Sequence, residues 1–257
     1  MKVAPDTTVC VANAEAVTMQ LDVATDAVLE TAIITPRFGD AVTITLDDGA
    51  LDFPLLEAPN TATVEWFAGG SEAAAFKSYA TVVSRHYFSL DQLRGFGDGS
   101  DDFESLPDDT LMAARQAATE VFEENAHRSF VARIGRTKDY GNGELLALEH
   151  RDVRELLTSG YRQASDSQLA RKPGCGPFPQ WVEYVYGADS IPAEVSRAVL
   201  TLAAYTLRPS NRPIGATGES TDAGYIHFTT AGRDGATDIP EVNAAIEQFG
   251  AGVRFLW

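Results

Sequence analysis

The sequence predicts an α+β protein in which a small antiparallel β-domain is followed by an α-helical bundle that carries a β-insert. Three observations predict it: β-branched residues alternate with polar ones in the first third of the chain, prolines precede three stretches with helical spacing, and an aromatic strand separates the first two helices. We therefore expect a β-rich domain over 1–92, an acidic Gly/Asp linker over 93–106 and a helical domain over 107–257. The β-insert is expected to span 130–187, and the helical domain ends in a C-terminal arm.

Composition limits the possible functions. The 257 residues have a formal net charge of −17, from 37 acidic and 20 basic side chains. Such a field repels a polyphosphate, which argues against nucleic-acid binding by the surface as a whole. The two cysteines, Cys10 and Cys175, are too few for a disulfide framework or a zinc site, so we expect free thiols. No stretch matches the apolar core of a signal peptide or a membrane span, which predicts synthesis in the cytoplasm and no membrane contact.

Three strands are expected in the N-terminal domain. Residues 42–46, 61–67 and 79–88 are rich in β-branched and aromatic side chains. The first of them alternates apolar residues with threonines, which places its apolar side chains on one face. Asp-Asp-Gly after the first strand and Gly-Gly after the second supply turns, so we expect an antiparallel arrangement.

The stretch GFGDGSDD (95–102) has two interpretations. As a calcium loop it offers Asp98, Ser100 and Asp102 at alternating positions. However, Phe103 occupies the position where an EF-hand has glycine, and Asp109 stands where it has glutamate. A solvated linker explains the composition better, and we expect neither a metal ion nor a cofactor in this protein.

Helices are predicted after Pro107, Pro192 and Pro240, because proline suits the first helical turn. The second of these stretches, IPAEVSRAVLTLAAYTL, is apolar around most of its circumference, so we expect several neighbours to bury it. The first is expected to bury one stripe, and the stripe contains Leu111, Ala114, Ala118, Val121 and Phe122.

The region between the first two helices contains one clear strand, WVEYVYG (181–187), which is aromatic and alternates. Upstream, GELLALEHRDVRELLTSG (143–160) fits a helix over 149–159 or two short strands around EHRD. Periodicity alone does not decide between them.

The order of these elements resembles the head–tail adaptor, or head-to-tail connector, proteins of long-tailed bacteriophages, especially the larger actinobacteriophage versions. The resemblance covers roughly 106–257. It consists of a helix ending in HRSF, a β-insert, WVEYVYG followed directly by IPAEVSRAVLTLAAYTL, an irregular arm and DIPEVNAAIEQF. The passage from the aromatic strand into IPAEV is its most specific part, and the N-terminal β-domain lies outside the pattern.

The resemblance implies a helical bundle with a β-containing loop and no enzymatic activity. It implies a homo-oligomeric ring, a dodecamer matching the portal, that lies in the virion neck and extends the DNA channel. The implied partners are the portal protein, a downstream stopper or terminator protein, and packaged DNA that passes through the lumen without sequence-specific binding. By the same analogy, residues 144–159 form a strand pair.

No catalytic constellation is visible in the sequence. Nucleotide-binding, zinc-protease and nucleophile-elbow motifs are missing, and the four histidines are isolated from one another. Two alternatives to the ring adaptor remain at this point: another phage neck or tail-completion protein, and a soluble hydrolase or binding module with a β accessory domain. The hydrolase would need a pocket with converging polar groups.

Two segments are predicted to contact partners. HRSFVARIGRTK carries the densest basic cluster, and acidic copies in a ring need a positive surface to meet a negative one. Its alternatives are a solvated strand that pairs with the preceding acidic helix, and a DNA contact. The C-terminal VRFLW is expected to anchor in a pocket of the portal, or else to fold back on the chain's own core. The predicted interface residues are Arg128, Arg133, Arg136, Lys138, Val253, Arg254, Phe255, Leu256 and Trp257.

Overall fold

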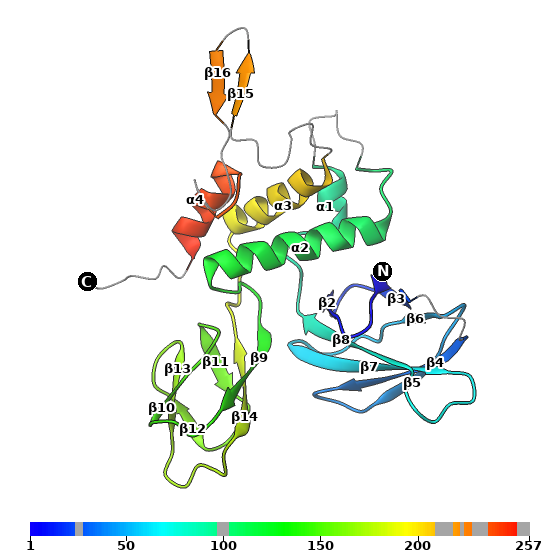
Figure 1. The fold of residues 1–257 in the computed structure, drawn as a ribbon, viewed down its shortest axis with the longest axis vertical. Coiled ribbons are helices and arrows are strands. Elements are labelled where there is room, and N and C mark those ends of the chain that lie inside the picture. Colours follow the sequence, from blue (N-terminus) through cyan, green and yellow to red (C-terminus); the bar gives the residue numbers. More distant parts are fainter. Residues whose placement is uncertain (24–27, 97–102, 209–217, 222–223, 228–235, 251–257) are drawn as a thin grey trace. The chain divides into compact units, whose positions relative to one another are not determined.

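The computed structural model describes the chain except residues 24–27, 97–102, 209–217, 222–223, 228–235 and 251–257. It forms two compact units. Figure 1 labels their helices and strands. The first unit joins Met1–His86 to Ser129–Ser190, and the second joins Tyr87–Arg128 to Ile191–Trp257. The candidate calcium ligands Asp98, Ser100 and Asp102, and with them residues 97–102 of the predicted linker, lie outside the described residues.

The N-terminal part of the first unit contains two sheets that share one core. The larger sheet has the order β2-β8-β7-β4-β5, and its strands are β2 (Thr8–Ala12), β8 (Phe76–Val83), β7 (Asn60–Ala68), β4 (Leu29–Pro36) and β5 (Val42–Thr45). The smaller has the order β1-β3-β6, with β1 (Lys2–Val3), β3 (Thr18–Leu21) and β6 (Ala50–Asp52). Trp66 on β7 is fully buried, and its indole N–H donates to the Ser78 hydroxyl at 2.9 Å. The one polar atom of this side chain is therefore hydrogen-bonded within the core.

The prediction that this domain is antiparallel is wrong for two strand pairs. Strand β2 runs parallel to β8, and β1 runs parallel to β3. The other pairs in the two sheets are antiparallel. Alternation along a segment predicts a strand but carries no information on direction, which depends here on the long connection between β2 and β8.

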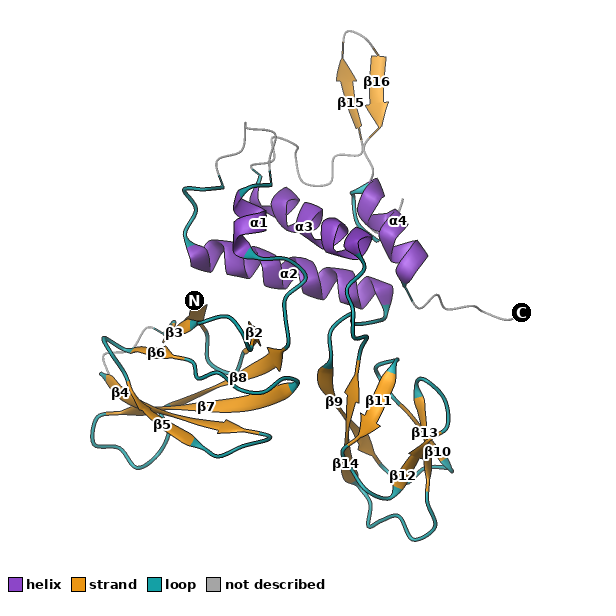
Figure 2. Cartoon of the chain, turned by 180° about the vertical axis from the view of Figure 1, so that it is seen from behind, coloured by secondary structure: helices purple, strands orange, loops and turns teal. Residues whose placement is uncertain are grey.

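The β-insert consists of two three-stranded sheets (Figure 2). One has the order β11-β14-β9, with β11 (Val153–Leu156), β14 (Gln180–Tyr186) and β9 (Arg133–Asp139). The other has the order β10-β13-β12, with β10 (Leu145–Ala147), β13 (Gln168–Arg171) and β12 (Tyr161–Gln163). Their side chains meet in a small core of Leu146, Tyr161, Leu169 and Val182. The open question at 149–159 is thereby answered, because β11 is a strand.

The second unit contains the helices α1 (Leu90–Arg94), α2 (Asp108–Ala126), α3 (Ala193–Leu207) and α4 (Pro240–Phe249). Helix α3 contacts the other three, which explains why it is apolar on so many sides. Apolar spacing does not predict helix α1, but a capping box marks its start: Ser89 accepts from the Gln92 N–H, and the Gln92 side chain accepts from the Ser89 N–H. Strands β15 (Gly218–Thr221) and β16 (Gly224–His227) form a hairpin.

The predicted α-helical bundle domain is also wrong. The described residues form sixteen strands and only four helices, so the protein is mostly β. The helices dominated the prediction because they are longer than many of the strands. Helix α2 has 19 residues and repeats its apolar stripe over several turns, whereas β10 and β12 have three residues each and show too little alternation to be recognised. Even in α2 one position of the predicted stripe differs, because Val121 is 39% exposed while Leu111 and Phe122 are fully buried.

Candidate interaction surface

Strand β9 divides its side chains between two faces. Gly135, Thr137 and Asp139 are buried, whereas Arg136 is exposed and Lys138 is half-buried. This is the period of two that a strand imposes on its side chains. Two of the four basic residues in the predicted HRSFVARIGRTK cluster, Arg136 and Lys138, therefore lie together on the outward face of β9.

Strand β14 adds an aromatic ring to that face. In the antiparallel register Trp181 stands opposite Lys138 and Glu183 opposite Arg136. The Arg136 guanidinium lies 4.2 Å from the centre of the Trp181 ring, and the Lys138 ammonium lies 5.7 Å from the same ring. Lys138 also lies 5.3 Å from the ring of Tyr140, just beyond the end of β9. These are cation–π distances, and we call Arg136, Lys138, Tyr140 and Trp181 the cation–aromatic patch.

The patch is exposed and positively charged. Trp181 is 49% exposed and Tyr140 is 62% exposed, which is unusual for large aromatic side chains. Within the described part of the chain neither Arg136 nor Lys138 forms an ion pair with a carboxylate, because the nearby Glu183 is bound by Arg37 at 2.6 Å. Trp, Tyr and Arg are the residues enriched in the energetic centres of protein interfaces.

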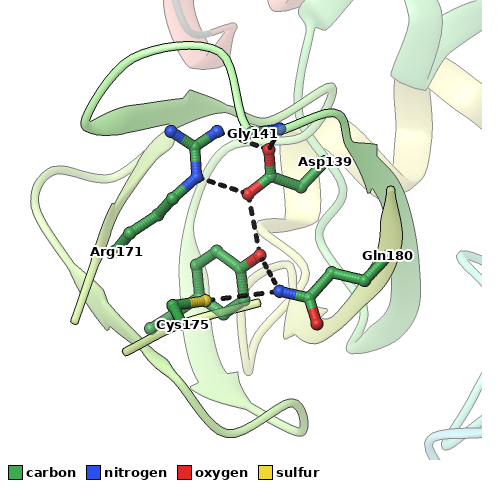
Figure 3. A network of polar contacts seen from close by, with 6 residues as sticks. Asp139, Gly141, Arg171, Cys175 and Gln180 are labelled. Atoms are coloured by element: carbon green, nitrogen blue, oxygen red, sulfur yellow. Dashed lines mark hydrogen bonds and ion pairs between the residues drawn. The ribbon is translucent and has the colours of Figure 1, made fainter. Parts of the chain in front are cut away.

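Behind the patch, the inward face of β9 is held by a buried polar network (Figure 3). Asp139 accepts two hydrogen bonds from the Arg171 guanidinium, with Nε at 2.6 Å and Nη2 as the second donor. It also accepts from the Gly141 N–H at 2.8 Å and from the Tyr161 hydroxyl at 2.7 Å. The Gln180 amide donates to the Tyr161 oxygen at 2.7 Å and contacts the Cys175 sulfur at 3.3 Å. The Asp139 carboxylate on β9 thus binds side chains of β12 and β13 directly, and β14 joins the network through the Tyr161 hydroxyl.

The network holds Asp139 as an anion. The hydrogen bond from Arg171 lowers the pKa of Asp139 to about 2, with help from the Gly141 N–H and the Tyr161 hydroxyl and against the cost of burial. The pKa of Tyr161 is raised, chiefly by burial and then by the bond to Asp139. Tyr161 therefore stays a hydrogen-bond donor and Asp139 an acceptor, which keeps the network in one arrangement at neutral pH.

The same strand therefore carries a hydrogen-bonded inner face and an exposed, cationic outer face. Asp139 fixes β9 to β13, and the residues just before and after it, Lys138 and Tyr140, belong to the patch. A surface whose backbone is fixed in advance loses less conformational entropy when a partner binds. The geometry suits recognition of another macromolecule.

The other predicted basic residues are used elsewhere. Arg128 belongs to the helical unit, where its guanidinium donates to the carbonyl of Phe249 at 3.3 Å. Arg133 begins β9, and it donates to Ser129 at 3.4 Å and to the Cys10 sulfur at 3.6 Å. The structure does not bring these two arginines into the patch. The predicted C-terminal anchor, residues 253–257, lies outside the described residues.

Sequence reasoning missed Tyr140 and Trp181 as site residues. The signal was present, since alternation along WVEYVYG places Trp181 and Glu183 on the face opposite to Val182 and Tyr184. What was lacking was the register between β9 and β14, which pairs Trp181 with Lys138. Alternation within each strand does not reveal which residues of two strands stand opposite each other.

Two further features of the described residues concern chemistry and location. No group of three or more His, Cys, Asp and Glu side chains among them is arranged to hold a metal ion. None of the helices that the structure describes is both long enough and apolar enough to span a bilayer.

Comparison with known proteins identifies no family. No family model matches the sequence, and no curated protein matches it. One similar solved structure is the neck of an empty gene transfer agent particle, computed with C6 symmetry: 18% identity, a TM-score of 0.38, and coverage of 49% of this chain and 82% of that chain. Another is the virion of a native gene transfer agent particle: 17% identity, a TM-score of 0.40, and coverage of 64% and 89%. Both TM-scores are below 0.5, so these similarities assign no role to the chain.

Proposed function

We propose that this chain is a structural protein of a phage-type virion neck, where it binds copies of itself and adjacent neck proteins and catalyses no reaction. The cation–aromatic patch carries the proposal. Its two cations lack carboxylate partners among the described residues, and its two aromatic rings are about half exposed. Exposed aromatic and cationic groups on a rigid strand pair are the composition of a protein-binding surface.

The resemblance of residues 106–257 to head–tail adaptors supplies the setting. In the finer form of the proposal the chain forms a ring, a dodecamer matching the portal, between the portal and a downstream stopper or terminator, and DNA passes through its lumen. Arg136 and Lys138 contact a partner directly, and residues 253–257 anchor in the portal. The two similar solved structures come from assemblies of the same kind, although their similarity is too small to support the proposal.

The decisive experiment locates the chain in particles. Particles purified from the host that produces this chain are analysed by quantitative mass spectrometry and by cryo-electron microscopy with an antibody fragment against the N-terminal β-domain. We expect about twelve copies per particle, which corresponds to one dodecameric ring, and added density at the junction of head and tail. A chain missing from the particles, or a copy number in the hundreds typical of a shell protein, contradicts the proposal.

A second measurement separates the adaptor from another neck component. A chain truncated after Gly252 is offered to isolated portal rings beside the full-length chain. We expect the truncated chain to fold and to bind the portal more weakly. Equal binding by both chains removes the anchor and leaves only the broader neck assignment.

A further inference from the structure

The cation–aromatic patch requires an acidic partner. Arg136 and Lys138 are two positions apart on β9, so their side chains emerge on one face about 6.6 Å apart along the strand. Trp181 lies beside both, with its ring centre 4.2 Å from the Arg136 guanidinium. A complementary surface therefore needs two carboxylates at a similar spacing and a shallow apolar area that accepts the flat indole ring.

The outward face of α2 has these features. Its exposed positions recur at intervals of three and four, as one face of a helix requires, and among them are Ala113, Ala117, Glu120, Val121 and Glu124. Glu120 and Glu124 are one turn apart, about 6 Å along the axis. Helix α2 contains a single basic residue, Arg115, and it is only 4% exposed. The exposed charged side chains of this helix are therefore acidic.

We propose that the cation–aromatic patch of one copy binds the outward face of α2 in a second copy. Arg136 and Lys138 pair with Glu120 and Glu124, whose spacing along the helix matches theirs along the strand. Trp181 packs over Ala117 and Val121, where the alanine leaves room for the ring and the 39% exposed valine gives it an apolar contact. This inference deepens the proposed function, because it identifies the contact through which copies assemble.

The patch and the α2 face are different surfaces, and each copy has one of each. A copy therefore uses them either on two neighbours, head-to-tail, or on one neighbour in a reciprocal two-fold pair. A repeated head-to-tail contact closes into a ring when its rotation divides a full turn, and otherwise forms an open chain. Because like charges disfavour a patch against a patch, the electrostatics exclude the direct pairing of two patches.

A second copy is a better occupant than nucleic acid. A cation beside an exposed tryptophan is also the chemistry of single-stranded DNA binding, in which bases stack on aromatic rings. However, a second copy offers two carboxylates at a spacing similar to that of Arg136 and Lys138, and it is present at the same concentration as the patch. DNA binding is therefore an outcome that the experiment must distinguish.

Charge reversal on both surfaces tests the contact with the full-length protein. One variant carries Arg136→Glu and Lys138→Glu, and the other carries Glu120→Lys and Glu124→Lys. Self-association is measured by sedimentation velocity up to about 1 mM, where even a weak contact is populated. We expect wild-type chains to associate, each variant alone to associate at least about a hundredfold more weakly, and an equimolar mixture of the two to recover association.

The mixture is the critical measurement, because it restores opposite charges at every contact between unlike copies. Variants that lost association through misfolding would not regain it in the mixture. The matched control is Arg162→Glu with Lys172→Glu, which makes the same charge change at exposed positions of the same insert and is expected to leave association unchanged. Wild-type chains that stay monomeric at about 1 mM, or a mixture that does not recover, overturn the inference.

Binding of a fluorescent single-stranded oligonucleotide is measured in parallel. If Trp181→Ala abolishes oligonucleotide binding while charge reversal leaves self-association unchanged, the patch serves DNA and the inference is wrong. The proposed function fails by a different result, namely a chain missing from particles. Association that recovers in the mixture supports the α2 contact even then.

Discussion

The two faces of strands β9 and β14 differ in how their charges are satisfied. On the inner face Asp139 is completely buried and accepts bonds from Arg171, Tyr161 and Gly141. On the outer face Arg136 and Lys138 lie against an exposed indole ring and have no carboxylate partner among the described residues. Because side chains alternate along a strand, adjacent residues lie on opposite faces and have different roles. Changes on the inner face should reduce folding free energy, and changes on the outer face should reduce binding to a partner.

The largest effect is expected from Asp139→Asn on the inner face. The side chain of Arg171 is 10% exposed, so the substitution leaves a buried cation without its counter-charge. Breaking a buried ion pair in this way costs roughly 3–5 kcal/mol of folding free energy. Urea denaturation followed by tryptophan fluorescence and circular dichroism measures the cost.

Lys138→Ala, one residue away and on the other face, is the matched control. It removes a partly exposed ammonium that makes cation–π contacts of about 0.5–1 kcal/mol at most. If Asp139→Asn and Lys138→Ala lose the same folding free energy, the inner face does not stabilise the fold more than the outer face.

An acid titration measures how much the Asp139 carboxylate contributes to folding free energy. The pKa of Asp139 is lowered in the folded state to about 2, below its value in an unfolded chain. Unfolded chains therefore bind the proton first as the pH falls, and the stabilisation present above about pH 4 is lost as the pH approaches 2. This carboxylate should account for roughly 2 kcal/mol of that loss.

The measurement compares the wild type with Asp139→Asn, because other carboxylates also titrate in this range. The difference in unfolding free energy between the two should narrow by that amount from about pH 5 to pH 2. A difference that stays constant shows that Asp139 is not the group responsible.

The sequence predicted the outer face better than the inner one. Arg136 and Lys138 stood out because they form part of a basic cluster in an acidic chain, and the period of a strand places them on one side. The inner network had no such signal. Arg171 is 32 residues from Asp139, and only the pairing of β13 with β12 and β10 brings it within reach.

The fold itself was predictable where elements are long. The stretches that became α2, α3 and β14 were recognised because each repeats its pattern several times. The mistaken helical bundle followed from underestimating the short strands of residues 130–187, which form two sheets with a shared core. Strands of three or four residues gain their stability from partners distant in sequence, which no local pattern reveals.

The smallest effect is expected at the outer-face ion pair between Arg37 and Glu183. The guanidinium donates to one carboxylate oxygen at 2.6 and 2.9 Å, which is good geometry, yet the Arg37 side chain is 44% exposed. An ion pair open to water contributes only about 0–1 kcal/mol, because solvent screens the charges and two long side chains lose freedom. A double-mutant cycle with Arg37→Gln and Glu183→Gln should give a coupling energy in that range that shrinks further in 1 M salt. A coupling as large as the cost of Asp139→Asn makes the outer face a source of stability as well, and the separation of roles between the two faces is then lost.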